Sequence, residues 1–197
     1  MTAGGIDTVS HLLPFLLYSL AKNPEIQEKV RDEADHILSG KRSKSIDFAD
    51  LPLLEYTGYC IKESLRVYPP FPNIPRCTNA PLEIDGKWIP SGVNVNIHIW
   101  LTHHNPEIWT NPFQFDPSRF SPENSKDRDP YAFIPFGAGP RQCIANQFTM
   151  TEAKIFTARV LHEFEISIDP NYELQYDISV TNILRGKLPL RFQSRVH

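Results

Sequence analysis

One loop of this chain carries the residue types best suited to bind a metal. It runs from Phe136 to Ala145, reads FGAGPRQCIA and contains one cysteine, Cys143. The cysteine lies just before a segment predicted to be helical from Ile144 to about His162. Its sulfur would therefore face unpaired backbone N–H groups and the positive end of the helix dipole. Both effects favour the thiolate, which is the form of cysteine that ligates metals.

The same loop also offers an approachable backbone and a fixed cation. Gly137 and Gly139 allow turns that other residues rarely adopt, so the backbone can come close to a flat ligand. Arg141 carries a permanent charge suited to a carboxylate. Together with the thiolate, these features predict a haem site, with iron on the sulfur and propionates on the arginine. The alternative is a small structural cysteine buried behind a loop, which is a common fate for a lone cysteine.

The pattern Phe136-x-x-Gly139-x-Arg141-x-Cys143 resembles the cysteine-loop signature of the cytochromes P-450. The resemblance implies that Cys143 is the axial ligand of the haem iron, and that the other three residues of the pattern adjoin the cofactor. Ala145 stands where the family usually has glycine. Because alanine is the smallest available change, we expect slight crowding under the haem and no loss of binding.

A second motif lies in the first predicted helix, which covers residues 1–22 and is apolar on most sides. Its start, Ala3-Gly4-Gly5-Ile6-Asp7-Thr8, resembles the oxygen-binding kink of the family's central helix. The resemblance implies that Asp7 and Thr8 are an acid–alcohol pair that guides protons during oxygen activation, and that Gly4 and Gly5 line the substrate groove. The alternative is a helix cap, because Asp and Thr are common near helix starts.

A third motif consists of an acid and a base three residues apart. Asp50 can cap a helix that we expect to run to about Tyr68, and Glu63 and Arg66 share one face of it, where they can form an ion pair. In the family this motif is buried and is joined by an arginine from a later proline-rich segment. The segment 115–120 resembles it and supplies Arg119. The resemblance implies a structural triad that locks the core holding the cysteine loop.

Two further segments resemble parts of the family that line the substrate pocket. Phe71, Asn73 and Ile74 follow the Glu-x-x-Arg helix and are the candidates for substrate contact. Arg76, in the same segment, resembles a second propionate partner, although it also fits an ordinary surface arginine. The turn at 181–183 resembles a loop that reaches the pocket from the C-terminal side.

Alternating and turn-rich patterns predict short strands beside the helices. The stretch 82–90 is a predicted hairpin with Asp85-Gly86 at its turn. Residues 93–99 alternate as a strand and extend the hairpin into a small sheet, and Leu188 to Phe192 is a predicted closing strand. The fold class is therefore mainly α with small antiparallel β-sheets (α+β), and the resemblance identifies it with the C-terminal part of the cytochrome P-450 fold.

Three histidines, His98, His103 and His104, raise the alternative of a separate metal site. Their spacing matches no recognised ligand pattern, and the last two lie beside Asn105-Pro106 at a turn. We therefore predict capping and hydrogen-bonding roles for them.

Composition limits the class of protein. The chain has 197 residues, with 41% hydrophobic and 22% charged side chains, as is typical of a soluble globular domain. A net charge of −3 gives no indication of a nucleic-acid partner. Cysteine occurs three times, at Cys60, Cys77 and Cys143, and this low, odd number favours a reducing compartment over a disulfide framework.

No targeting or anchoring segment is visible. The first residues lack a basic region, and the apolar run from Leu12 to Leu20 is far shorter than the roughly 20 residues that span a bilayer. Members of the family are much longer than this chain. We therefore expect residues 1–197 to be the C-terminal haem-binding portion of a cytochrome P-450 domain, with the N-terminal portion absent.

The resemblance also implies an activity. It predicts a haem-thiolate monooxygenase that inserts one atom of O2 into a C–H bond of a lipophilic substrate, with electrons from an NADPH-dependent reductase. Residues 119–125 and 130–136 look most like the branch that hydroxylates fatty acids at the ω end. That branch often has a glutamate that bonds covalently to haem, where this chain has Gly4, so we expect haem b held non-covalently.

The resemblance also implies a cellular location, and two other functions compete with the monooxygenase. The parent enzyme is expected at the cytosolic face of the endoplasmic reticulum membrane, which it would contact through segments absent from this chain. One competing function is a haem-thiolate isomerase or dehydratase, against which the pair Asp7-Thr8 argues. The other is a truncated, non-catalytic fragment that binds haem poorly.

Overall fold

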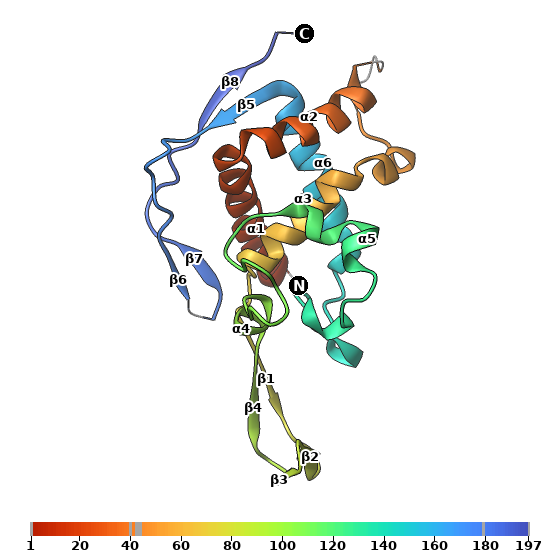
Figure 1. The fold of residues 1–197 in the computed structure, drawn as a ribbon, viewed down its shortest axis with the longest axis vertical. Coiled ribbons are helices and arrows are strands. Elements are labelled where there is room, and N and C mark those ends of the chain that lie inside the picture. Colours follow the sequence, from red (N-terminus) through yellow and green to blue (C-terminus); the bar gives the residue numbers. More distant parts are fainter. Residues whose placement is uncertain (1, 40, 42–44, 179, 197) are drawn as a thin grey trace.

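The structure, a computed structural model, describes residues 2–39, 41, 45–178 and 180–196, with backbone alone for residues 2–4. Its centre is a group of packed helices (Figure 1). These are α1 (Thr2–Lys22), α2 (Pro24–Leu38), α3 (Glu55–Val67) and α6 (Asn146–Glu163). Their shared core is apolar and almost fully buried, and includes Leu12, Leu16, Leu20, Ile61, Leu65, Ala153 and Leu161. None of the helices in the described ranges is long and apolar enough to cross a membrane.

The first two helices agree with the sequence prediction in their extents. α1 buries Leu12, Leu16 and Leu20 along one face, as expected for a central helix. α2 follows at once, with Pro24 in its first turn and Val30 and other small apolar residues inward.

The start of α3 differs from the prediction. Asp50 does not cap this helix but belongs to a separate 3-10 turn, η1 (Phe48–Leu53), where it forms a capping box with Asp47. The chain turns at Leu54, so α3 begins only at Glu55. Its first N–H groups are satisfied from another helix, because the Glu33 carboxylate of α2 accepts the backbone N–H groups of residues 56 and 57 at 2.6 and 2.8 Å.

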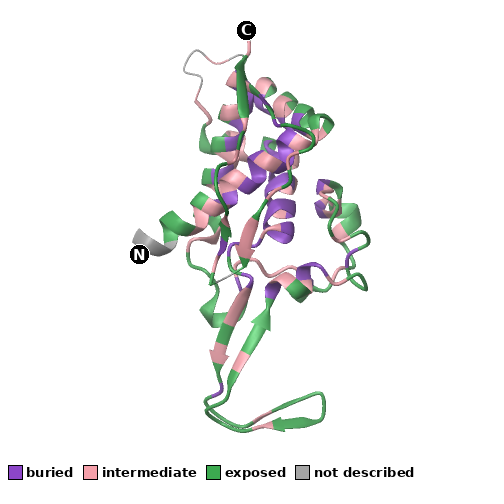
Figure 2. Cartoon of the chain, turned by 90° about the vertical axis from the view of Figure 1, so that its left-hand side faces the viewer, coloured by how far each residue is buried: buried purple, intermediate pink, exposed green. Residues whose placement is uncertain are grey.

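The strands form pairs, and the single small sheet expected from the sequence is wrong. β1 (Asn73–Cys77) pairs antiparallel with β4 (Asn94–His98), and β2 (Leu82–Ile84) pairs with β3 (Lys87–Ile89). The predicted turn is confirmed: Asp85 and Gly86 have φ of 55° and 74°, as a tight hairpin requires. The two pairs form an arm that extends away from the helices (Figure 1), and much of it is exposed (Figure 2).

Two further pairs lie at the C-terminal end. β5 (Phe164–Ser167) pairs with β8 (Arg191–Ser194), and β6 (Tyr176–Ile178) pairs with β7 (Asn182–Leu184). The closing strand therefore begins three residues later than Leu188, the predicted start.

The segment between β4 and α6 is a meander of short turns. It contains α4 (Ile99–His103), η2 (Pro117–Phe120), α5 (Pro122–Ser125), η3 (Pro130–Ala132) and η4 (Gly139–Arg141). Several of these turns start at a proline, which fits the first turn of a helix but prevents a long one. A small apolar cluster of Trp109, Phe120 and Ala132 holds the meander together.

Candidate active site

The cysteine loop closes on itself through two backbone hydrogen bonds. The N–H of Gly137 donates to the carbonyl of Ile134 at 3.0 Å, and the N–H of Cys143 donates to the carbonyl of Phe136 at 2.9 Å. Gly137 and Gly139 have φ of 73° and 72°, a region that favours glycine. Cys143 is exposed, which is unlike a small structural cysteine buried behind a loop.

The glycines also show what lies around the loop. A Cβ on Gly137 would lie 3.4 Å from Cδ1 of Ile74, whereas one on Gly139 would meet nothing within 4 Å. Ile74, a predicted pocket residue on β1, therefore lies against the loop, and the backbone at Gly139 faces open space.

The helix after the cysteine starts later than predicted. α6 begins at Asn146, not Ile144, and Ala145 is its N-cap with φ −91° and ψ 10°. The Ala145 carbonyl accepts the N–H of Thr149 at 2.8 Å. Because this backbone conformation is ordinary for any residue, alanine replaces the family's usual glycine here without backbone strain.

The residues around Cys143 fit a haem. Ile144 follows it directly and Phe148 lies in the first turn of α6, and these two side chains are 92% and 69% exposed, although large apolar side chains are normally buried. A flat apolar ligand bound at the sulfur would cover such side chains. Arg141, in η4, is also exposed, and its charge suits a propionate.

The acid–alcohol pair lies on α1. Asp7 is exposed and stands in the second turn of a helix that begins at Thr2, so it is not a cap. Its carbonyl accepts hydrogen bonds from Ser10 Oγ at 3.0 Å and from His11 Nδ1. These partners of Asp7 belong to α1 itself, which is joined to the cysteine loop through its packing against α6.

The glycines near this pair give space on the same helix. The hydroxyl of Thr8 donates to the Gly5 carbonyl at 3.5 Å. A Cβ on Gly5 would meet nothing within 4 Å. For Gly4 only the helical backbone is described.

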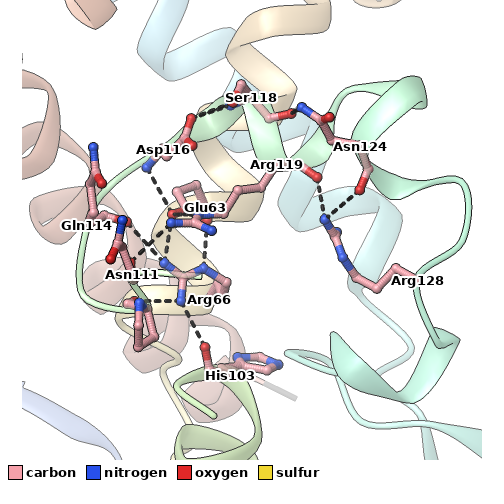
Figure 3. Close-up of polar contacts among 11 residues, drawn as sticks. Glu63, Arg66, His103, Asn111, Gln114, Asp116, Ser118, Arg119, Asn124 and Arg128 are labelled. Carbon is pink, nitrogen blue, oxygen red and sulfur yellow. Dashed lines mark hydrogen bonds and ion pairs between the residues drawn. The ribbon is translucent and has the colours of Figure 1, made fainter. Parts of the chain in front are cut away.

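A buried ionic node lies behind the loop, formed by Glu63, Arg66 and Arg119 (Figure 3). The side chains of Glu63 and Arg66 are both 0% exposed and are joined at 2.7 Å. A second bond, from Arg66 Nε to Glu63 Oε2 at 2.8 Å, makes the pair bidentate. Arg119 Nε approaches Glu63 Oε1 at 3.4 Å without a hydrogen bond. The structure thus brings together the three residues that the resemblance connects.

Arg66 uses all of its donors. Besides Glu63, it donates to the carbonyls of His103 at 2.8 Å, Pro112 at 2.7 Å and Gln114 at 3.2 Å. A guanidinium has five N–H donors, and each has an acceptor within the node. The N–H of Asp116 donates to the Glu63 carboxylate at 3.0 Å, so the node attaches residues 103–116 to α3.

Burial sets the electrostatics of the node. It raises the pKa of the Glu63 carboxyl, while the hydrogen bonds and charge of Arg66 oppose that shift. Removing one partner from such a pair leaves a buried charge unpaired, which typically costs about 3–5 kcal/mol. This cost is consistent with the structural role that the resemblance implies, and the side chains of Glu63 and Arg66 are closed to solvent.

An outer layer that the sequence did not reveal covers the node. Trp109 is 2% exposed, and the guanidinium carbons of Arg66 and Arg128 lie 5.1 and 4.4 Å from its ring centroid. Arg128 also donates to the carbonyls of Arg119 and Asn124. Arg128 belongs to no motif with fixed spacing, so only the three-dimensional contact with the Trp109 ring identifies it.

The histidines make hydrogen bonds. His103 is fully buried and its Nε2 accepts the N–H of Ile134 at 3.0 Å. His104 Nδ1 lies 2.8 Å from the Trp100 carbonyl, and His98 is exposed at the end of β4. Within the described part of the chain, no three His, Cys, Asp or Glu side chains are grouped as metal ligands.

The predicted pocket residues lie on and beside β1. Phe71 is 37% exposed, and Asn73 and Ile74 begin the strand that runs to the arm. Arg76 is partly exposed and its Nη1 donates to the Pro75 carbonyl at 2.9 Å.

Residues 181–183, predicted to form a turn, instead lead into β7, which starts at Asn182, and they are attached to the start of the pocket segment. Asn182 donates through its backbone N–H to Pro70 at 3.0 Å and through Nδ2 to Pro69 at 2.7 Å. This places the C-terminal hairpin beside the prolines that precede Phe71.

A cavity of about 620 Å³ opens between α3, α6 and the cysteine loop. Its lining includes Lys62, Phe136, Gln142 and Lys154. Lys154 donates to the Leu51 carbonyl at 3.0 Å, and burial lowers its pKa.

Comparison with known proteins shows the family of the chain. A family model described as Cytochrome P-450 matches residues 1–192. Human cytochrome P-450 4F8 is 45% identical over 167 residues, which is 84% of this chain and 32% of the relative. Leukotriene-B4 omega-hydroxylase 3 of Mus musculus is 45% identical over 166 residues, with the same two shares. Human cytochrome P-450 4X1 is 44% identical over 173 residues, 87% of this chain and 34% of the relative.

The chain thus spans about a third of the length of the curated relatives it matches. The family model nevertheless covers all but the last few residues, including the cysteine loop and the ionic node. The chain belongs to the cytochrome P-450 family.

Proposed function

We propose that the protein is a haem-thiolate monooxygenase that inserts one atom of O2 into a C–H bond of a lipophilic substrate. The observation that carries this proposal is the exposed Cys143 beside Ile144 and Phe148, which are 92% and 69% exposed. A thiolate in the midst of uncovered apolar side chains is suited to a flat, apolar, iron-containing ligand. Residues 1–197 would supply the haem-binding portion of a cytochrome P-450 domain.

The haem would be held by residues of the loop and of β1. Cys143 would ligate the iron, Phe136 and Gly139 would back the ring, and Arg141 and Arg76 would pair with the propionates. Because Gly4 offers no carboxylate, haem b would be held non-covalently. Thiolate-ligated haem supplies the oxygen activation, and the protein supplies ligand, orientation and exclusion of water.

Other residues of the chain would transfer protons and bind substrate on the face of the haem opposite to Cys143. The carboxylate of Asp7 would hold a proton and the hydroxyl of Thr8 would pass it on. Open space at Gly5 would admit the reacting group. Phe71 and Ile74 would bind an apolar substrate and exclude water from it.

The name of one relative supports a substrate class. Leukotriene-B4 omega-hydroxylase 3 is named for a reaction at the ω position. We extend that reaction class to this protein as hydroxylation of a fatty acid. The competing isomerase or dehydratase function would need neither NADPH nor a reductase, so turnover that depends on both would separate the two.

The electrons would come from an NADPH-dependent reductase. The cavity beside the cysteine loop is lined by Lys62 and Lys154 and by one carboxylate, Glu55, and its remaining positive charge suits an acidic partner surface. The whole protein would act at the cytosolic face of the endoplasmic reticulum membrane.

The test is a reduced, CO-bound absorption spectrum of the purified protein. The expected result is a Soret band at the family's red-shifted position, which reports a thiolate on iron. A band typical of histidine-ligated or free haem would refute the proposal, and Cys143→Ser should abolish the red-shifted band. A CO spectrum of residues 1–197 alone separates a competent chain from a non-catalytic fragment.

A further inference from the structure

His103 lies at the end of α4 and connects two parts of the site. Its ring is 0% exposed, and Nε2 accepts the N–H of Ile134 at 3.0 Å. The ring also stacks on Phe133, with centroids 5.3 Å apart. Because Nε2 accepts a hydrogen bond, the ring proton must lie on Nδ1, which has no hydrogen-bond partner in the described structure.

The backbone of the same residue belongs to the ionic node. The carbonyl of His103 accepts a hydrogen bond from Arg66 Nη1 at 2.8 Å. The node therefore fixes the main chain of His103, and the side chain extends that anchor to Ile134 (Figure 3 shows the bond to Arg66).

From Ile134 the hydrogen bonds continue to the cysteine. The carbonyl of Ile134 accepts the N–H of Gly137 at 3.0 Å, and the carbonyl of Phe136 accepts the N–H of Cys143 at 2.9 Å. The next residue is Pro135, which has no N–H. The N–H of Ile134 is therefore the last backbone donor before Phe136. A hydrogen bond to it can fix the chain where it enters the cysteine loop.

We propose that His103 is a positioning residue for the cysteine ligand, which links the node of Glu63 and Arg66 to the loop that presents the Cys143 sulfur. This inference rests on the proposed function. The essential atom is the acceptor Nε2. A side chain of similar volume without an acceptor should leave the loop entrance loose, although the node itself remains intact.

The test compares four substitutions in the protein expressed from its complete reading frame. His103→Phe keeps a flat ring but removes the acceptor, and His103→Asn keeps polarity but is too short to reach Ile134. His103→Gln can place its Oε1 near the original acceptor position. His104→Phe is the matched control, because the same exchange one residue later removes a bond to Trp100 and not to Ile134.

The first measurement is hydrogen exchange of residues 133–143 without haem. We expect His103→Phe and His103→Asn to exchange about tenfold faster there, as follows from loss of one buried hydrogen bond. His103→Gln and His104→Phe should match the wild type in this segment. Circular dichroism melting shows which variants are folded. If His103→Phe is unfolded, the comparison uses His103→Asn alone.

The second measurement is the ferrous CO spectrum of the haem-loaded protein. The thiolate-type band should be lost faster on standing in the Phe and Asn variants, and Gln should restore its persistence. Unchanged exchange and unchanged band in the Phe and Asn variants, or a Gln variant no better than Asn, would overturn the inference. A wild type without the thiolate-type band would refute the proposed function instead, while the exchange comparison would still decide whether His103 holds the loop.

Discussion

Acid should destabilise the folded protein through His103. Burial lowers the pKa of this histidine from its ordinary 6.5 to about 3, and the nearby charge of Arg66 and the ring of His104 add to that shift. In the unfolded chain the ring takes up a proton below about pH 6.5, whereas in the folded protein it stays neutral until about pH 3. The stability that depends on a neutral His103 is therefore fully present above the unfolded pKa and is lost as the pH falls toward the folded one.

The magnitude follows from the distance between the pH and the unfolded pKa. At pH 5 the solution is about 1.5 units below that pKa, and each unit is worth about 1.36 kcal/mol. Moving from pH 8 to pH 5 should therefore lower the free energy of unfolding by about 2 kcal/mol through this residue alone.

Urea unfolding at pH 8 and pH 5 tests this value, with His103→Gln as the control. Gln has no titrating group but offers an acceptor for Ile134, so the wild type should lose about 2 kcal/mol more than the variant between the two pH values. Carboxylates, and His104, whose pKa burial also lowers, titrate in both proteins and cancel. Equal losses, within about 0.5 kcal/mol, would refute the assignment of a buried neutral histidine.

Further predictions concern the node, the packing and the cofactor face. Arg66→Lys should lower the free energy of unfolding by about 2–4 kcal/mol, because three donors cannot serve five acceptors; a change below about 0.5 kcal/mol in urea unfolding would contradict this. Gly58→Ala should gain less stability in urea unfolding than the roughly 1 kcal/mol that alanine gains over glycine inside a helix, since its Cβ would lie 3.0 Å from Cε of Lys154, and the full gain should appear when the lysine is also replaced by alanine. Phe148→Ser should weaken haem binding about tenfold through lost apolar contact, whereas Phe113→Ser, at a similarly exposed phenylalanine, should leave haem titrations unchanged.

Local patterns predicted the elements whose causes are local. The bounds of α2 follow from a proline at its start and an apolar face of period 3.6. The β2–β3 hairpin follows from Asp85-Gly86, whose positive φ values suit a two-residue turn. In both cases the deciding residues lie within a few positions of the element itself.

Elements whose causes lie elsewhere in the chain were not predicted correctly. α3 begins at Glu55 because Glu33, on another helix, satisfies its first N–H groups. β1 was not predicted as a strand, because Asn73–Cys77 holds a proline and finds its partner only in Asn94–His98. Tertiary hydrogen bonds, which leave no periodic trace in the sequence, decided these cases.

Some residues of the candidate site were likewise indicated by local sequence, and others only by contacts between distant segments. The spacing around Cys143 indicated a metal loop from residue chemistry, but the link between Glu63, Arg66 and Arg119 came only from a family resemblance, since a Glu-x-x-Arg motif is common by chance. His103 and Trp109 act through a backbone amide and a ring face. The sequence indicated a hydrogen-bonding role for His103 but not its partner, because no residue type at fixed spacing identifies the backbone amide of Ile134.

The hydrogen bonds of Arg66 give a physical reason for a buried ion pair next to the candidate site. Burying two charges is costly, and the attraction between them often only offsets that cost. An apolar pair of the same volume would fill the space, but it would leave the carbonyls of His103, Pro112 and Gln114, all bonded to Arg66, without donors in a dry interior. Ahead of the cysteine loop, the backbone hydrogen bonds within the meander join residues three or four positions apart and close only local turns, so its course across the molecule depends on those donors. The node therefore fixes the course of the chain that leads into the cysteine loop. A metal ligand requires this defined position of the backbone more than it requires added stability.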